Sequence, residues 1–122
     1  MEVKNLMIGD WYFDKELLKA RKFHQLQFAE SFGNPTYELF LEPIPLTEEI
    51  LKANGFDYDW EDGWEYKGKD YEPLIACSPK DNFVSIDYNG CSSEYNISYV
   101  HQLQHALRLC GLNNLAENFK LE

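Results

Sequence analysis

Two histidines stand four residues apart in a segment rich in helix formers. On a helix, His101 and His105 would lie on the same side, a spacing that lets two imidazoles bind one metal ion. Zinc needs a third and a fourth ligand, and the residues between the histidines supply no general base. We therefore favour solvated or helix-capping histidines, keep this pair only as a weak metal candidate, and expect no metal and no cofactor.

Acidic and aromatic side chains alternate in a tract that begins at Asp57. Asp57, Asp59 and Glu61 are spaced as in the first half of a calcium-binding loop. That loop needs glycine at its sixth position and glutamate at its twelfth, where Asp62 and Gly68 stand instead. The calcium match fails, and the tract is better interpreted as a solvated strand face.

Carboxylates beside aromatic rings are also found in glycosidases, which hold two carboxyl groups about 5–10 Å apart across a cleft. A chain of 122 residues that is rich in hairpins has little room for a deep cleft. The serines, histidines and cysteines form no nucleophile motif, and Asn89-Gly90 is not a phosphate loop. We identify no catalytic residue. A small hydrolase or metal-dependent enzyme using His101, His105 and nearby carboxylates is the alternative hypothesis.

The net charge of −10 is concentrated in the middle of the chain. Residues 38–80 carry −7, residues 81–122 carry −3, and residues 1–37 are neutral, with a small basic cluster at Lys15, Lys19, Arg21 and Lys22. Aromatic residues make up 16% of the chain, which argues against disorder. This acidity excludes nucleic-acid binding through a basic face, and no apolar run approaches the ~20 residues of a membrane span. We expect neither partner.

The cysteines and the N-terminus indicate a cytoplasmic protein. Cys77, Cys91 and Cys110 are an odd number without a Cys-x-x-Cys motif, which is typical of free thiols in a reducing compartment. The first ten residues have neither the long apolar core nor the cleavage site of a signal peptide.

Turn signals place two hairpins. Asn89-Gly90 predicts the pairs Val84–Tyr95, Ile86–Ser93 and Tyr88–Cys91. In the acidic tract, a two-residue Asp62-Gly63 turn would put Tyr58 and Trp60 on the opposite face from Trp64 and Tyr66. We favour a three-residue Glu61-Asp62-Gly63 loop with Gly63 left-handed, which pairs Trp60 with Trp64 and Tyr58 with Tyr66. The four aromatic side chains then share one face, and Asp57, Asp59 and Glu65 share the other.

Two helices are expected, at about 47–54 and 99–110. Thr47 caps the first, and Gly55 ends it in a left-handed conformation. Ser98 is the expected cap of the second, with Gly111 as its stop. On this helix Val100, Leu103, Ala106, Leu107 and Cys110 form an apolar side, opposite a polar side of His101, Gln104, His105 and Arg108.

The ends of the chain are less sharply patterned. Residues 6–13 predict a strand interrupted at Gly9-Asp10, and residues 37–41 predict another. Residues 16–30 are ambiguous, because helix formers dominate while residues 24–28 alternate with a period of two. Residues 112–122 are expected to form a polar tail with a short strand at 118–121.

Four sequence blocks follow one another along the chain: NL-x-IGDW from Asn5, EPIPLTEEIL from Glu42, NGF from Asn54 and YVHQLQ from Tyr99. In this order they resemble a family of small uncharacterised proteins of gut bacteria, their phages and mobile elements. The resemblance covers most of the chain and implies that residues 6–42 form a small curled β-unit. The family has no established activity, so the resemblance implies no function.

These elements predict a single α+β domain over residues 1–122. It would comprise a small N-terminal β-unit (about 1–45, not independently stable), a mostly antiparallel meander sheet and two helices. We favour a non-catalytic interaction protein with an acidic, aromatic surface near residues 57–72 that meets a basic protein partner. Its candidate binding residues are Asp57, Tyr58, Asp59, Trp60, Trp64, Glu65 and Tyr66.

Overall fold

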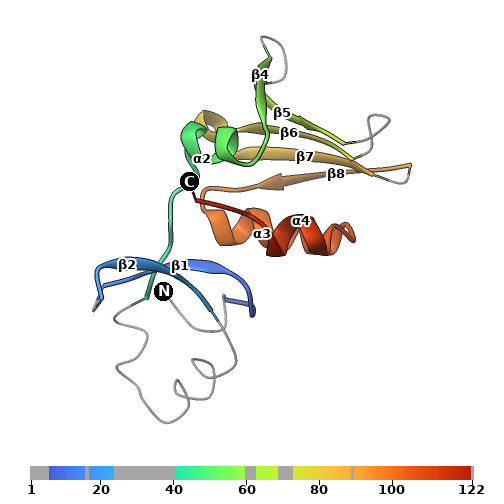
Figure 1. Cartoon of the computed structure of the whole chain (residues 1–122). Coiled ribbons are helices and arrows are strands. Elements are labelled where there is room, and N and C mark those ends of the chain that lie inside the picture. The colour runs from blue at the N-terminus through green and yellow to red at the C-terminus, as the bar shows by residue number, and fades with distance from the viewer. Residues whose placement is uncertain are drawn as a thin grey trace.

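The computed structural model describes residues 6–15, 17–23, 41–59, 63–68, 73–88 and 90–121. These residues form a three-stranded antiparallel sheet, a five-stranded antiparallel sheet and three α-helices (Figure 1), which confirms the α+β fold class. The helices α3 (Val100–Leu109) and α4 (Asn113–Glu117) lie between the two sheets (Figure 1). The prediction that the N-terminal β-unit is unstable by itself stays a prediction.

The N-terminal sheet has the strand order β2-β1-β3. Its strands are β1 (Trp11–Asp14), β2 (Lys19–Lys22) and the short β3 (Leu41–Glu42). The predicted first strand is displaced toward the C-terminus, because Ile8 and Gly9 form a turn in which the amide of Asp10 donates to the carbonyl of Met7.

The other N-terminal predictions are only partly described. The ambiguous stretch is a strand at Lys19–Lys22, while residues 24–30 lie outside the described residues. Of the strand predicted at 37–41, only Leu41 is described, and it begins β3. A small core of Leu6, Tyr12, Phe23 and Leu41 holds this sheet together.

The larger sheet is the predicted meander, in which each strand pairs with the next along the chain. Its strands are β4 (Asp57–Asp59), β5 (Gly63–Lys67), β6 (Leu74–Ser78), β7 (Phe83–Tyr88) and β8 (Cys91–Asn96). A 3-10 turn, η4 (Pro79–Asp81), joins β6 to β7. The strands β7 and β8 pair in the predicted register, which is confirmed at Val84–Tyr95, Ile86–Ser93 and Tyr88–Cys91.

The predicted register of the first hairpin is wrong by two residues. Tyr58 pairs with Trp64, and Asp59 pairs with Gly63, while residues 60–62 lie outside the described residues. Gly63 is left-handed as predicted, with φ +81°, but it belongs to β5. A Cβ at this glycine would lie 3.0 Å from the carbonyl oxygen of Cys77, so the missing side chain allows close contact with β6. Because the error is an even number of residues, the division of side chains between the two faces is unchanged.

Helix α2 (Glu48–Ala53) begins and ends at the residues that the sequence indicates. The Thr47 hydroxyl accepts a hydrogen bond from the amide of Ile50 at 3.3 Å, which satisfies one free amide of the first turn. Gly55 follows with φ +86°, and the amide of Phe56 donates to the carbonyl of Leu51. Phe56 is thereby folded back into the core.

Helix α3 is confirmed, but its predicted cap is wrong. The N-cap position is Tyr99, and the side-chain oxygen of Gln102 accepts hydrogen bonds from the amides of Ser98 and Tyr99, at 2.8 and 3.1 Å. Gln102 thus satisfies amides just before the helix, a different contact from the one predicted for the Ser98 hydroxyl, which would accept from an amide of the first turn. Gly111 ends the helix with φ +82°, as predicted.

The polar tail predicted after Gly111 is wrong, because residues 113–117 form α4. The short strand predicted at 118–121 is wrong as well, since these residues form no strand, and Ala116 and Phe119, three residues apart, are both buried in the core. The main core lies between the inner face of the five-stranded sheet and the helices. Its members include Leu51, Phe56, Ile75, Val84, Ile86, Val100, Leu103, Leu107 and Phe119.

Replacing Gly63 by alanine is expected to destabilise the protein more than replacing Gly111. Both residues have positive φ, which costs an alanine about 1–2 kcal/mol, but a Cβ at Gly111 meets no atom within 4 Å. The difference between Gly63→Ala and Gly111→Ala in denaturant unfolding isolates the clash with Cys77. Equal losses would contradict the close approach of β5 to β6.

Candidate functional site

The five-stranded sheet has one face that none of the described helices covers (Figure 1). A row of directly paired residues crosses all five strands on it, running Asp57, Glu65, Ala76, Ser85 and Glu94. Asp87 lies on the same face, two positions beyond Ser85 along β7. We call the surface formed by Asp57, Glu65, Ala76, Ser85, Asp87 and Glu94 the outer face.

The outer face carries like charges at close quarters. Asp57 and Glu65 stand directly opposite each other, an arrangement that destabilises a strand pair. Glu65 is only 8% exposed, and the Nζ of Lys67 lies 3.6 Å from its Oε2. This lysine offsets part of the repulsion, while Asp57 and Glu94 are open to solvent. The solvent-exposed part of the outer face therefore carries negative charge.

A small cavity of about 170 Å³ opens at the β4 end of the outer face. It is lined by Gly55, Asp57, Tyr58, Asp59, Glu65 and Lys67. Tyr58 is 61% exposed, and its ring contacts that of Trp64 edge-on at a centroid distance of 5.6 Å. The cavity has the size of one side chain, and its acidic lining suits a cationic one.

The predicted binding residues separate into two groups. Four of them, Asp57, Tyr58, Asp59 and Glu65, come together around this cavity. Trp64 and Tyr66 instead pack against the core, and Trp60 lies outside the described residues. The binding role itself stays a prediction.

Two acids of the outer face, Asp87 and Glu94, were missing from the predicted site. Both alternate with apolar residues in the second hairpin, so the predicted register of that hairpin already placed them on the face opposite the core. What the sequence could not indicate was the pairing of β5 with β6, which joins the two hairpins into one acidic surface.

His105 belongs to a polar contact between α3 and the N-terminal segment. The Nε2 of His105 is in short contact with the Oδ2 of Asp10, and the Nη1 of Arg108 donates to the Oδ1 of the same carboxylate at 2.5 Å. Asp10 is fully buried and also accepts from the amide of Met7 at 2.7 Å. The expectation of solvated or capping histidines is therefore wrong, because the N-terminal sheet covers this side of the helix.

Gln104 completes this contact, and its side chain is fully buried. Its Oε1 accepts from the amide of Trp11 at 2.9 Å, and its Nε2 donates to the carbonyls of Gly9 and Ala116 at 3.1 and 3.0 Å. The indole Nε1 of Trp11 in turn donates to the carbonyl of Phe119 at 2.7 Å. We call Asp10, Trp11, Gln104, His105 and Arg108 the polar junction.

His101 is poorly placed for metal or acid–base chemistry. It is 6% exposed, its ring stacks on Tyr99 at 6.0 Å, and its Nδ1 has no hydrogen-bond partner among the described residues. Burial lowers the pKa of His101 below its usual 6.5, and the charge of His105 lowers it further, while Asp10 opposes both effects. The neutral ring is thus the favoured form.

Other chemistry finds little support in the part of the chain that the structure describes. No group of three His, Cys, Asp or Glu side chains there is arranged to hold a metal ion. Burial raises the pKa of the Cys77 thiol to about 12, which leaves it protonated and unreactive at neutral pH.

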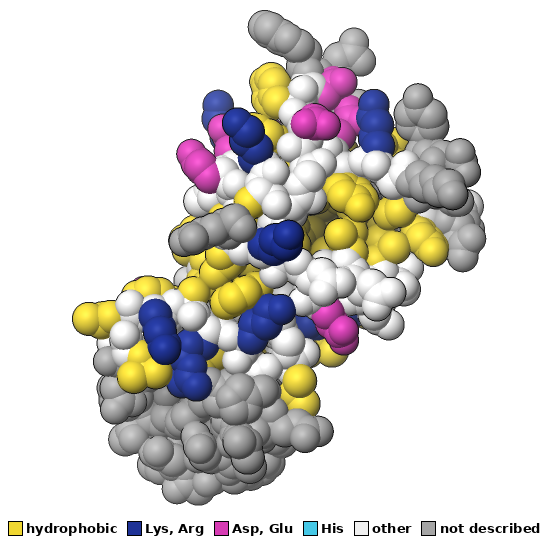
Figure 2. Space-filling view, in the orientation of Figure 1, with side chains coloured by type: hydrophobic (Ala, Val, Ile, Leu, Met, Phe, Trp, Pro, Cys, Tyr) yellow, Lys and Arg dark blue, Asp and Glu magenta, His cyan; other side chains and the backbone are white. Residues whose placement is uncertain are grey.

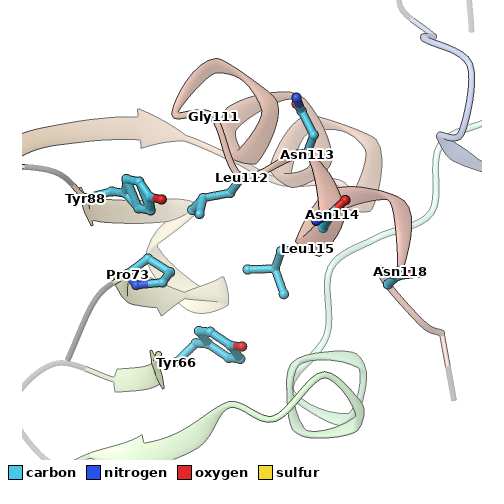
Figure 3. A pocket seen from close by; sticks show the side chains of 9 residues that line it. All are labelled: Tyr66, Pro73, Tyr88, Gly111, Leu112, Asn113, Asn114, Leu115 and Asn118. Atoms are coloured by element: carbon cyan, nitrogen blue, oxygen red, sulfur yellow. The ribbon is translucent and has the colours of Figure 1, made fainter. Parts of the chain in front are cut away.

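A larger groove, of about 420 Å³, lies between the five-stranded sheet and α4 (Figure 3). The rings of Tyr66 and Tyr88, Pro73 and the side chains of Leu112 and Leu115 form its walls. Asparagines of α4 and the segment after it lie at its edge, and none of its described lining residues is charged. Figure 2 shows this hollow and the hydrophobic side chains that line it. It could accept an uncharged group, but it contains no chemistry of its own.

Comparisons with protein-family models, with curated proteins and with solved structures give no match to this chain. Among the described residues, no helix is long and apolar enough to cross a membrane.

Removing the carboxylate of Asp10 is expected to cost about 3–5 kcal/mol of unfolding free energy, because Arg108 would lose the partner of its partly buried charge. Asp10→Ala can be compared with Asp57→Ala, which removes an exposed carboxylate and should change stability by less than about 0.5 kcal/mol. Chemical denaturation measures both. A loss of unfolding free energy below about 1 kcal/mol for Asp10→Ala would be close to that of an ordinary surface substitution. It would show that the polar junction does not secure the N-terminal sheet.

Acidification is expected to destabilise the protein through His101. The unfolded chain takes up a proton near pH 6.5, whereas the folded chain resists it until lower pH, so stability falls as the pH drops below about 6.5. His101→Phe, which preserves the ring stacked on Tyr99, should flatten this part of the stability curve. If the unfolding free energies of the wild-type protein and of His101→Phe changed with pH in the same way, burial of His101 would not explain the loss of stability in acid.

Proposed function

We propose that this chain is a non-catalytic binding protein whose outer face binds a basic segment of a protein partner. The observation that carries the proposal is the row of paired residues that places Asp57 and Glu65 at one end and Glu94 at the other. Carboxylates at both ends of this row attract a cationic partner.

The residues between these acids favour close approach. Ala76 and Ser85 occupy the middle of the row, and both are too small to hold a partner away from the sheet. Neighbouring strands lie about 4.8 Å apart, so the five-strand row spans about 19 Å. An extended segment of about six residues covers that length. The expected partner therefore carries lysine or arginine near both ends of such a segment.

The cavity at β4 supports the same partner chemistry. Its acidic lining and the exposed ring of Tyr58 suit the charge and the aliphatic stem of one lysine or arginine. Tyrosine is also among the residues enriched at protein interfaces. Trp64 and Tyr66 would contribute indirectly, by fixing the strand that carries Glu65.

The alternative function, a small hydrolase or metal-dependent enzyme, has less support. Arg108 and His105 both bind the carboxylate of Asp10, which leaves that carboxylate committed to the fold. His101 is buried and neutral. We also propose, from the free thiols and the sequence resemblance, a cytoplasmic protein related to those of mobile elements.

Charge reversal on the outer face tests the proposal. The probe is a fluorescein-labelled, lysine-rich peptide of about six residues, and its binding to the full chain is followed by anisotropy at low salt. Glu94→Lys should weaken binding about fivefold or more, since a close charge pair contributes up to about 1 kcal/mol.

Glu117→Lys is the matched control, because it makes the same charge change at an exposed position on α4, away from the outer face. If both variants weaken binding equally, the peptide responds only to net charge and the outer face is not the site. If neither does, the proposal is wrong.

A further inference from the structure

The turn between β1 and β2 exposes two adjacent leucines. Leu17 is 50% exposed and Leu18 is 75% exposed, although a leucine side chain in water loses the benefit of burial. We call Lys15, Leu17, Leu18 and Lys19 the β1–β2 tip. Scattered single apolar residues need no explanation, but a neighbouring pair at the end of a hairpin does.

The backbone of the tip makes the choice of leucine more unusual. Leu18 has φ +55°, in the left-handed region that glycine and asparagine adopt readily and that branched side chains avoid. The turn is held by Asp14, whose Oδ1 accepts from the amide of Leu17 at 3.1 Å. A leucine thus stands where both the backbone and the solvent disfavour it, which indicates that its side chain serves a contact outside the chain.

Basic side chains lie near the leucine pair. Lys15 and Lys19 are exposed, with Glu16 between Lys15 and Leu17 in the sequence, and the guanidinium of Arg21 lies on the next strand, 3.3 Å from the carboxylate of Asp14. Lysine and arginine side chains gather beside hydrophobic ones over the N-terminal sheet (Figure 2). Residues 14–22 contain four basic and two acidic side chains, a local charge of +2 on a chain of net charge −10, which favours an anionic surface.

The shape of the tip distinguishes between anionic partners. A stable protein interface buries about 800 Å² on each side, and a projecting two-residue tip offers much less. A lipid headgroup layer admits a small convex projection, because lipids move apart around it. The two sheets lie on opposite sides of α3 (Figure 1), so the tip and the acidic outer face belong to different parts of the molecule.

We propose that the β1–β2 tip binds the surface of an anionic membrane, with Leu17 and Leu18 inserted among the headgroups and Lys15 and Lys19 beside the lipid phosphates. This contact is peripheral and requires no membrane-crossing helix. It is independent of the proposed function of the outer face, since it uses the other sheet.

Vesicle flotation of the full chain tests the proposal, with vesicles of phosphatidylserine and phosphatidylcholine compared with vesicles of phosphatidylcholine alone. The wild-type protein should float with the anionic vesicles. Leu18→Asn should lower its partition coefficient at least about tenfold, because one inserted side chain is lost. The same variant should raise or preserve the thermal midpoint, because asparagine tolerates the left-handed backbone.

Two further variants complete the experiment. Leu109→Asn removes a leucine that is 77% exposed on α3, and it should leave vesicle binding unchanged. Replacing Lys15 and Lys19 by glutamine should weaken binding to the anionic vesicles alone. If the wild-type protein floats with neither kind of vesicle, the membrane proposal is wrong. The expected partner of the tip is then an acidic protein. Equal losses for Leu18→Asn and Leu109→Asn overturn the membrane proposal as well.

Discussion

One buried amide group holds three parts of this fold in place. The side chain of Gln104 bonds the N-terminal sheet at Gly9 and Trp11 and the C-terminal helix at Ala116. A buried amide without partners is costly, so the helix can be covered on this side only if all three bonds form together. Helix α3 is thereby buried on two opposite sides, one apolar and facing the large sheet, the other polar and facing the small one.

Local signals were sufficient for the parts of the fold that local forces decide. Thr47 accepts from a backbone amide three residues away, and Gly90 adopts the left-handed conformation that a tight turn needs, so the helix cap and the hairpin register could be predicted. The polar side of α3 was misjudged because its partners, such as Asp10, lie more than 90 residues away. Helix α4 was missed for the same reason, since its five residues depend on Ala116 reaching the core.

In the candidate site, the predicted alternation of side chains is correct, but the residues do not all lie on the same surface. Alternation in the acidic tract fixed which residues share a face, so Asp57 and Glu65 were placed together correctly. The same alternation separates them from Trp64, which belongs to the core. The acidic surface becomes extensive only when Glu94 joins it from β8, and that requires the order of all five strands.

The polar junction also has a consequence for the order of folding during synthesis. Its contacts between the N-terminal segment and the C-terminal part of the chain join residues separated by 93 to 108 positions. Gly9 and Trp11 leave the ribosome long before their partners on α3 and after α4, which are synthesised more than 90 residues later. Closing so long a loop is also slow. The N-terminal sheet can therefore reach its final packing only after α3 and α4 have been synthesised, and until then Asp10 and Trp11 lack these partners.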